Sequence, residues 1–231
     1  MMKIELFSDF ACPFCYIAKT RLQQAIQQLN LEDEVEIEYK AYQLDPGATK
    51  LEARPFYDDL IHKGQSKEKI KQLTESIQTH ADEVGLTFNF DAIQLANTEN
   101  AHRLSKLAKT LGKEAQFVDT MMETYFTKGI NLNDEAQLLA VCDEVNIPRK
   151  QAIEVLHSNQ FSEQLANDRY DAQQLQITSV PFFVFEDQYG IKGVEPIEIF
   201  TKTLLQAQQV ATKRLKVIGN DLTCGPDSCS L

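Results

Sequence analysis

Two cysteines that lie three positions apart near the amino terminus constrain the fold more than any other feature of the chain. Cys12 and Cys15 stand where a short apolar strand pattern, which includes Leu6 and Phe7, gives way to a helical pattern of apolar residues. The thiols therefore occupy a predicted turn from a strand into a helix. This setting favours a redox-active pair, because a C-x-x-C sequence beside a strand-helix unit is typical of thiol-disulfide chemistry.

The first turn of a helix favours the thiolate form of a cysteine, since its unpaired N–H groups and the helix dipole carry partial positive charge. Pro13 fits the first helical position, where a missing N–H group costs no hydrogen bond. We therefore predict that Cys12, at the exposed corner, is the nucleophile and that Cys15 resolves the mixed disulfide. Two alternatives stay open: half of a zinc site, which needs further ligands nearby, and a pair of incidental core cysteines.

The composition describes a globular protein without an electrostatic reason to bind polyanions. The chain has 231 residues, 43% of them hydrophobic, and a formal net charge of -11, so we expect no nucleic-acid or anionic membrane partner. Residues 1–9 lack the apolar region and cleavage site of a signal peptide, and no run reaches the roughly 18 apolar residues of a membrane span. We expect a cytoplasmic protein in a reducing compartment, where structural disulfides are rare.

The order of predicted elements indicates a thioredoxin fold that is interrupted in its middle. Residues 35–41 alternate apolar and charged side chains, as in a half-exposed strand. Residues 181–185 and 191–192 predict two strands joined by a hairpin, and Pro196 suits the start of a last helix. From about residue 51 to residue 177 the sequence shows helical patterns and no convincing strand. The sum is βαβ, a helical insertion, and ββα.

We therefore predict an α/β protein with three parts. Residues 1–48 and 178–213 form a discontinuous thioredoxin-like domain, and residues 49–177 form an all-helical insertion. Residues 214–231 form a flexible tail that carries a C-x4-C pair. A homodimer is compatible with the sequence, which does not decide the oligomeric state.

Five short motifs follow one another over nearly the whole chain. They are Asp9-Phe10-x-Cys12-Pro13-x-Cys15, Tyr42-x-Leu44-x-Pro46, Asn97-Thr98-x-x-Ala101-His102-Arg103, Ser179-Val180-Pro181-Phe182-Phe183, and Gly193 with Pro196. In this combination they resemble the DsbA-type thiol oxidoreductases, and most closely the cytoplasmic FrnE-like branch. The resemblance implies dithiol-disulfide exchange or isomerisation with protein or small-molecule thiols and disulfides, and no required cofactor.

The resemblance also implies roles for three residues. In proteins of this fold the proline before the third strand has a cis peptide bond and lies against the dithiol, so we expect a cis Val180-Pro181 bond. Without the resemblance, Pro181 is an ordinary strand-start proline. The backbone of Val180 is then expected to pair with an extended substrate. Phe14 stands where periplasmic DsbA proteins have a histidine that stabilises the thiolate, so we expect a milder oxidant.

Asn97 and His102 are candidate groove residues. Asn97 or Thr98 suits the cap of a helix that carries His102, and the plainer interpretation is a partly exposed or cap-related histidine. The resemblance implies instead that residues 97–103 line the groove over the dithiol, without a catalytic role for His102. Three other histidines belong to no motif and are expected on the surface: His62, His80 and His157.

The remaining cysteines divide into two kinds. Cys142 lies on the apolar face of a predicted helix, as a small buried hydrophobe would. Cys224 and Cys229 flank a Gly-Pro turn in the tail. They are an auxiliary dithiol, a local disulfide without consequence, or metal ligands. The resemblance supports the first, because some FrnE-like proteins carry a C-x4-C pair, and we predict no metal site.

Two rival functions stay open. Kappa-type glutathione transferases and the related chromene-carboxylate isomerases look similar in architecture but typically place Ser-Pro-x-Ser at the corner, so the two cysteines here argue against them. Glutathione remains a candidate co-substrate of a thiol-disulfide enzyme. The other rival is a non-catalytic binder of peptides or metal ions.

Overall fold

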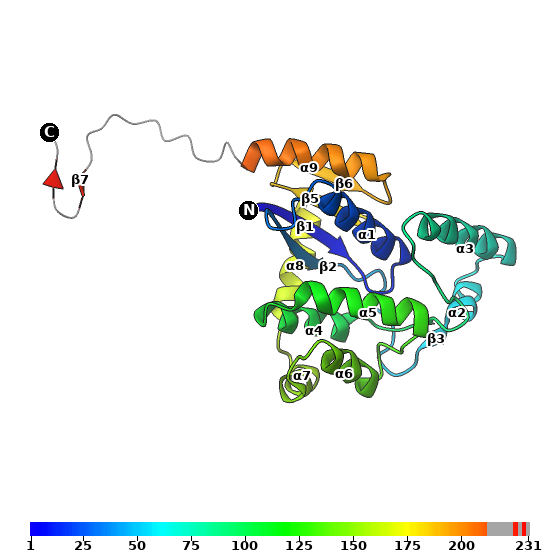
Figure 1. The fold of residues 1–231 in the computed structure, drawn as a ribbon. Coiled ribbons are helices and arrows are strands. Elements are labelled where there is room, and N and C mark those ends of the chain that lie inside the picture. The colour runs from blue at the N-terminus through cyan, green and yellow to red at the C-terminus, as the bar shows by residue number, and fades with distance from the viewer. Residues whose placement is uncertain (212–223, 226–227, 230–231) are drawn as a thin grey trace.

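A computed structural model describes residues 1–211, 224–225 and 228–229. Its main sheet has the strand order β2-β1-β5-β6 (Figure 1). β1 (Met2–Ser8) runs parallel to β2 (Val35–Ala41) and antiparallel to β5 (Phe182–Phe185), which pairs antiparallel with β6 (Tyr189–Lys192). The predicted strands are confirmed, and the two ends of the chain meet in one sheet.

Helices cover both faces of this sheet. α1 (Pro13–Gln28) and α9 (Ile197–Ala211) pack against each other on the face that holds the main core, whereas α8 (Ser162–Gln174) packs beside β2 on the other face. β1 has a neighbour on each side and is buried toward both faces. Its Leu6 belongs to the main core and Phe7 to a smaller cluster on the α8 side.

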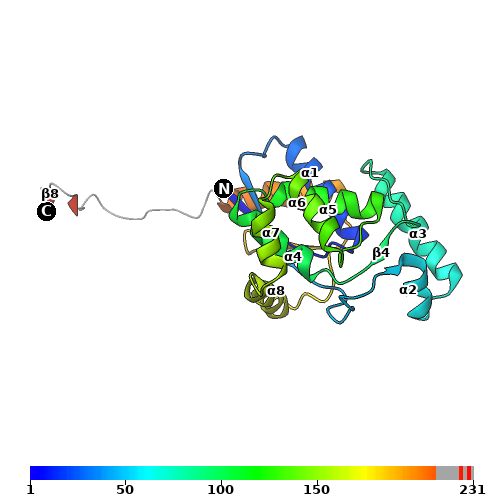
Figure 2. The ribbon, with the colours of Figure 1, turned by 90° about the horizontal axis from the view of Figure 1, so that it is seen from below.

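The segment between β2 and β5 is mostly helical, as predicted. Before α8 it contains α2 (Phe56–His62), α3 (Lys67–Asp82), α4 (Glu99–Thr110), α5 (Glu114–Lys128), α6 (Glu135–Glu144) and α7 (Arg149–Leu156). In both views α2 and α3 stand together at one side of the molecule, apart from the group formed by α4 to α7 (Figures 1 and 2). The predicted domain limits after residues 48 and 177 stay predictions.

One expectation about this segment is wrong. It contains two short strands, β3 (Arg54–Pro55) and β4 (Gln94–Leu95), which pair antiparallel. Two-residue strands are too short to produce an alternating pattern of apolar and polar residues, so they could not be predicted from the sequence. The seven-residue helix α2 spans only two turns, which is also too short for a clear helical pattern of apolar residues.

Gly85 and Gly112, which follow α3 and α4, have left-handed backbones with φ of 74° and 67° and end these helices. In the tail, β7 (Cys224–Gly225) and β8 (Ser228–Cys229) pair antiparallel in the backbone, but the cysteine side chains lie outside the described residues. Within the described part of the chain, no helix is both long and apolar enough to cross a bilayer.

Candidate active site

The turn between β1 and α1 presents the two predicted thiols. Cys12 is the N-cap residue of α1, with an extended backbone (φ -96°, ψ 108°), and Pro13 follows as the first helical residue. The Cys12 N–H group donates to the carbonyl oxygen of Asp9 at 3.1 Å, and the Cys15 N–H group donates to that of Cys12 at 3.0 Å. Cys12 therefore stands at the amino end of the helix, where the dipole favours an anion.

The two thiols differ in their access to the surface. Cys12 is 4% exposed and lines a groove of about 610 Å³, whereas Cys15 is 0% exposed. The expectation that Cys12 occupies an exposed corner is thus wrong, because the groove walls shield the residue on most sides. Burial, followed by interaction with Cys12, raises the pKa of the Cys15 thiol well above its ordinary value. Cys15 is therefore held in its protonated form.

The loop before β5 closes over the dithiol. The Val180-Pro181 peptide bond is cis, as the resemblance implied. The Cys12 thiol donates a weak hydrogen bond to the Val180 carbonyl oxygen, with 3.9 Å between sulfur and oxygen, and Val180 lines the same groove. The structure therefore brings together four of the predicted site residues, Cys12, Cys15, Val180 and Pro181.

The groove extends from Cys12 between α1 and the insertion. Its apolar lining comes from α1, from the loop after β2 and from the helical insertion: Phe14, Leu44, Phe56, Leu60, Leu73, Ile77 and Leu95. Charged side chains also line it, from the corner, the loop after β2, β3 and the region of α2: Asp9, Asp45, Glu52, Arg54, Asp59 and Lys63. An apolar trough with charged groups of both signs suits an amphipathic ligand such as a peptide segment.

Phe14 lines this groove and lies beside His80, which was expected on the surface. The ring centroid of His80 lies 6.5 Å from that of Phe14, and its Nδ1 atom is 3.3 Å from a guanidinium nitrogen of Arg21. His80 is half-buried, because α3 packs against α1. His62 and His157 are exposed, as expected.

The structure corrects the expectations for Asn97 and His102. Both are buried and neither lines the groove, although Thr98 does. The Asn97 amide donates to the carbonyl oxygen of Ala48 at 2.8 Å, and its Oδ1 atom accepts from the Glu99 N–H group at 2.9 Å, so it anchors the start of α4. His102 is neither partly exposed nor part of a cap, because its ring turns inward.

Asp9 is the site residue that sequence reasoning missed. Asp9 is 1% exposed, and its Oδ2 atom accepts a hydrogen bond from the Leu44 N–H group at 2.7 Å. Oδ1 lies 3.3 Å from Nε2 of His102 and accepts a longer bond, 3.4 Å, from the Ala11 N–H group. Asp9 thus ties the turn before Cys12 to the loop after β2 and to α4. Asp9 belongs to the first of the five motifs, and this was the one feature of the sequence that could have marked it as a site residue.

The other predicted cysteine sites are separate from this centre. Cys142 is fully buried in α6, as expected, and burial raises the pKa of its thiol to about 12. The predicted auxiliary dithiol of Cys224 and Cys229 is not tested by the described side chains. Among the described residues no group of three or more His, Cys, Asp or Glu side chains is arranged to hold a metal ion.

The fold and the paired thiols define a thioredoxin-fold oxidoreductase. The chain belongs to the DSBA-like thioredoxin domain family, whose model matches residues 3–205. This match confirms the predicted fold class and the resemblance to DsbA-type proteins.

Three proteins that are similar to this chain differ in sequence identity and in structural agreement. The crystal structure of the probable DsbA oxidoreductase SCO1869 from Streptomyces coelicolor is 30% identical, with a TM-score of 0.88 over 100% of this chain and 99% of that chain. The uncharacterized protein YwbO of Bacillus subtilis (strain 168) is 26% identical over 210 residues, which are 89% of this chain and 97% of YwbO. The cytosolic disulfide reductase DsbM from Pseudomonas aeruginosa, solved with GSH, is 14% identical with a TM-score of 0.61, over 91% of this chain and 98% of that chain, and shares the fold alone.

Proposed function

We propose that this protein is a cytoplasmic thiol-disulfide oxidoreductase in which Cys12 is the nucleophile and Cys15 the resolving thiol. The observation that carries the proposal is the unequal placement of the two thiols. Cys12 lines a groove of about 610 Å³, whereas Cys15 is fully buried one helical turn away. A substrate in the groove meets Cys12 first, and among the thiols whose side chains the structure describes, Cys15 is the one placed to attack the mixed disulfide that forms.

The exchange proceeds in two displacement steps. The Cys12 thiolate attacks one sulfur of a substrate disulfide, whose S–S bond breaks, and the first substrate thiolate leaves and takes a proton from solvent. The Cys15 thiolate then attacks the Cys12 sulfur of the mixed disulfide, and the second substrate thiolate leaves. Two electrons have passed from the dithiol to the substrate, and a Cys12-Cys15 disulfide remains. The reverse sequence oxidises a substrate dithiol.

Protein and small-molecule disulfides are the proposed substrates, and the exchange needs no cofactor because sulfur atoms carry all the electrons. Glutathione is the proposed co-substrate, since two glutathione thiols can reduce the Cys12-Cys15 disulfide and leave as glutathione disulfide. The description of DsbM as cytosolic, and its structure with GSH, support this choice and the cytoplasmic location. The resemblance to the cytoplasmic FrnE-like branch supports the cytoplasmic location as well.

Trapping the mixed disulfide tests the proposal. In a Cys224→Ser/Cys229→Ser background, which removes the tail thiols, the reduced protein is mixed with glutathione disulfide and analysed by mass spectrometry. With Cys15→Ser added, we expect a stable glutathione adduct on Cys12. With Cys12→Ser added, we expect no adduct. The background protein itself should end with an intramolecular Cys12-Cys15 disulfide.

Other outcomes point to the rival functions. Full disulfide-exchange turnover in the Cys12→Ser variant would contradict the proposal. Conjugation of an electrophile to glutathione, with no disulfide exchange, would indicate a transferase instead. Binding of peptide without either reaction would indicate a non-catalytic binder.

A further inference from the structure

Arg21 is a buried cation on α1 that binds the backbone of the turn between β6 and α9. It is 4% exposed and lies about two helical turns after Phe14, on the same side of the helix. Its Nη1 atom donates to the carbonyl oxygen of Glu195 at 2.9 Å and to that of Val194 at 3.4 Å. A buried guanidinium needs acceptors for its N–H groups, so this turn is held against α1 by a charged donor.

The turn that Arg21 holds is bonded to the cis-proline loop. The Gly193 N–H group donates to the Pro181 carbonyl oxygen at 2.9 Å, which extends the pairing of β5 with β6 beyond the strands themselves. Gly193 has φ of 82°, a conformation that glycine adopts without steric strain. The Pro181 carbonyl is therefore fixed by a turn that Arg21 fixes in its place on α1.

Pro181 in turn places the backbone of Val180 at the groove. Val180 lines the groove, and its carbonyl oxygen lies 3.9 Å from the sulfur atom of Cys12. Within the part of the chain that the structure describes, the Val180 N–H group has no backbone or side-chain acceptor. This N–H group is therefore available to pair with an extended substrate whose sulfur reaches Cys12.

Arg21 also binds α3, which forms one wall of the groove through Leu73 and Ile77. Its Nη2 atom donates to a carboxylate oxygen of Glu83 and lies 3.3 Å from Nδ1 of His80. The two terminal nitrogens of the guanidinium thus have different partners, since Nη1 binds the turn before α9 and Nη2 binds α3. This division makes it possible to remove one set of contacts and keep the other.

We propose that Arg21 is a positioning residue for the edge of the site that binds the substrate backbone. It holds the turn after β6, and through Gly193 this turn holds Pro181 and keeps the backbone of Val180 in place. The proposal rests on the thiol-disulfide function above and deepens it, because it assigns part of the affinity for peptide substrates to a residue that does not touch them. A small disulfide without peptide groups does not use this edge, so its reaction with Cys12 is independent of Arg21.

Two coloured mixed disulfides test this assignment. One joins thionitrobenzoate to the central cysteine of a short peptide, and the other joins it to mercaptoethanol, which has no peptide group. In a Cys15→Ser/Cys224→Ser/Cys229→Ser background, the Cys12 thiolate attacks the peptide or mercaptoethanol sulfur, and thionitrobenzoate leaves as its coloured thiolate. The rate measured against substrate concentration gives a half-saturation concentration and a limiting rate.

The expected effect of Arg21→Met is a selective loss of affinity for the peptide. We expect its half-saturation concentration to rise about tenfold, with the limiting rate within about twofold of the background protein. Pairing that is equal in the bound substrate and in the transition state changes affinity alone, which is the reason for this split. The mercaptoethanol disulfide should react at an unchanged rate. Glu83→Ala, which removes a contact to α3 and keeps the carbonyl contacts, should leave the kinetics of both substrates unchanged.

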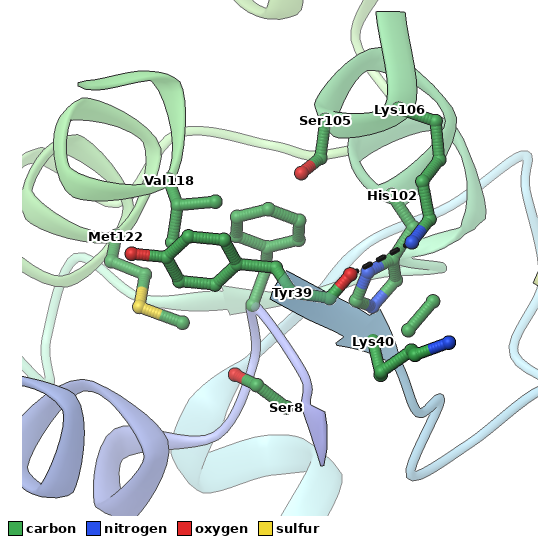
Figure 3. A pocket seen from close by; sticks show the side chains of 10 residues that line it. Ser8, Tyr39, Lys40, His102, Ser105, Lys106, Val118 and Met122 are labelled. Carbon is green, nitrogen blue, oxygen red and sulfur yellow. Dashed lines mark hydrogen bonds between the residues drawn. The ribbon is translucent and has the colours of Figure 1, made fainter. Parts of the chain in front are cut away.

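Lys106 provides a matched control, because it is another buried cation that binds a backbone carbonyl (Figure 3). It is 7% exposed, and it donates to the Tyr39 carbonyl oxygen at 2.7 Å beside a small cavity that shares no lining residue with the groove. Tyr39 lies on β2, which β1 separates from β5 in the sheet. We therefore expect Lys106→Met to leave the kinetics of both substrates unchanged.

The outcomes separate this inference from the proposed function. If the background protein releases thionitrobenzoate from neither substrate, the thiol-disulfide function fails and the inference fails with it. If release occurs and Arg21→Met loses nothing, or loses equally with both substrates, the inference alone fails. It also fails if Glu83→Ala or Lys106→Met reproduces the selective loss with the peptide.

Hydrogen exchange of the Gly193 amide measures the proposed link directly, and Arg21→Lys carries this test if Arg21→Met does not fold. A lysine keeps the charge, but its single ammonium cannot replace two guanidinium nitrogens that bind the turn and α3 at once. We expect the Gly193 amide to exchange faster in Arg21→Lys than in the background protein, as followed by NMR. Unchanged exchange at Gly193 would overturn the inference.

Discussion

The Sγ atom of Cys12 lies 3.9 Å from the carbonyl oxygen of Val180, although 168 positions separate the two residues in the sequence. The pairing of β1 with β5 explains this proximity, because Phe7 stands opposite Phe182 in the antiparallel register. Cys12 follows β1 by only a few residues, and Val180 shortly precedes β5. The site therefore forms only when the two ends of the chain meet, and the helical insertion is held between them.

The reactivity of the described thiols should follow their burial. Burial raises the pKa of Cys15 well above its ordinary value and that of Cys142 to about 12, so both stay protonated near neutral pH. In the Cys224→Ser/Cys229→Ser background at pH 7.5, we expect iodoacetamide to modify Cys12 alone. Adding Cys12→Ser should leave the native protein unlabelled, as read by peptide mass spectrometry.

Labelling in denaturant is the control, and it should modify every remaining cysteine. Rapid labelling of Cys15 in the native Cys12→Ser protein would contradict the burial that the mechanism requires.

Glu114 should make stability depend on pH. Burial raises its pKa from 4.5 to about 7, so the folded state holds a proton that the unfolded state has lost between these values. Stability contributed by the protonated carboxyl is therefore lost as the pH rises from about 4.5 to 7. We expect Glu114→Gln to gain about 2 kcal/mol in unfolding free energy, relative to the parent protein, between pH 5 and pH 8. Urea denaturation at both values measures this difference.

An exposed glutamate on α7 provides the matched control. Glu154→Gln should change the unfolding free energy little at either pH. An equal effect of Glu114→Gln at pH 5 and pH 8 would show that the buried carboxyl does not titrate in this range.

The main elements could be predicted because their signals are local. The alternation of residues 35–41 and the helical spacing of apolar side chains depend only on near neighbours, and both correspond to observed elements. The corner with Cys12 and Cys15 followed from the same local patterns. The cis bond at Pro181 came from the resemblance and not from the patterns.

What could not be predicted depends on distant partners. His102 is buried because it meets Asp9, which lies 93 positions earlier, and no local pattern reports that contact. A polar residue on a helix looks exposed until its partner is known. The shielding of Cys12 has the same origin, since the groove walls come from the insertion and from the loop after β2.

Arg103 should be important for stability because its guanidinium group donates hydrogen bonds to buried backbone carbonyl oxygens. It is 4% exposed, and it donates to the carbonyl oxygens of Val155, Ser158 and Gln160, the last at 2.8 Å. Arg103→Met leaves these acceptors near the end of α7 without their donor. We expect the unfolding free energy to fall by about 3 kcal/mol in urea denaturation.

The control for this change is an exposed arginine with an ion pair. Arg149 pairs with Asp143 at 2.5 Å, and about half of each side chain is exposed. Arg149→Met should cost less than about 1 kcal/mol. If both variants lose the same stability, the carbonyl network of Arg103 contributes nothing beyond a surface charge.

Alanine substitutions at Gly129 and Gly112 can distinguish the cost of backbone strain from the cost of a steric clash. Both end helices with φ of 67°, where an L-residue costs about 1–2 kcal/mol. A Cβ atom at Gly112 would meet nothing within 4 Å, whereas one at Gly129 would lie 2.0 Å from the carbonyl oxygen of Ala92. We therefore expect Gly112→Ala to lose only the strain term and Gly129→Ala to lose about 2 kcal/mol more, because the backbone before β4 must move. Urea denaturation of the two variants measures the difference, and equal losses would mean that Ala92 does not confine this turn.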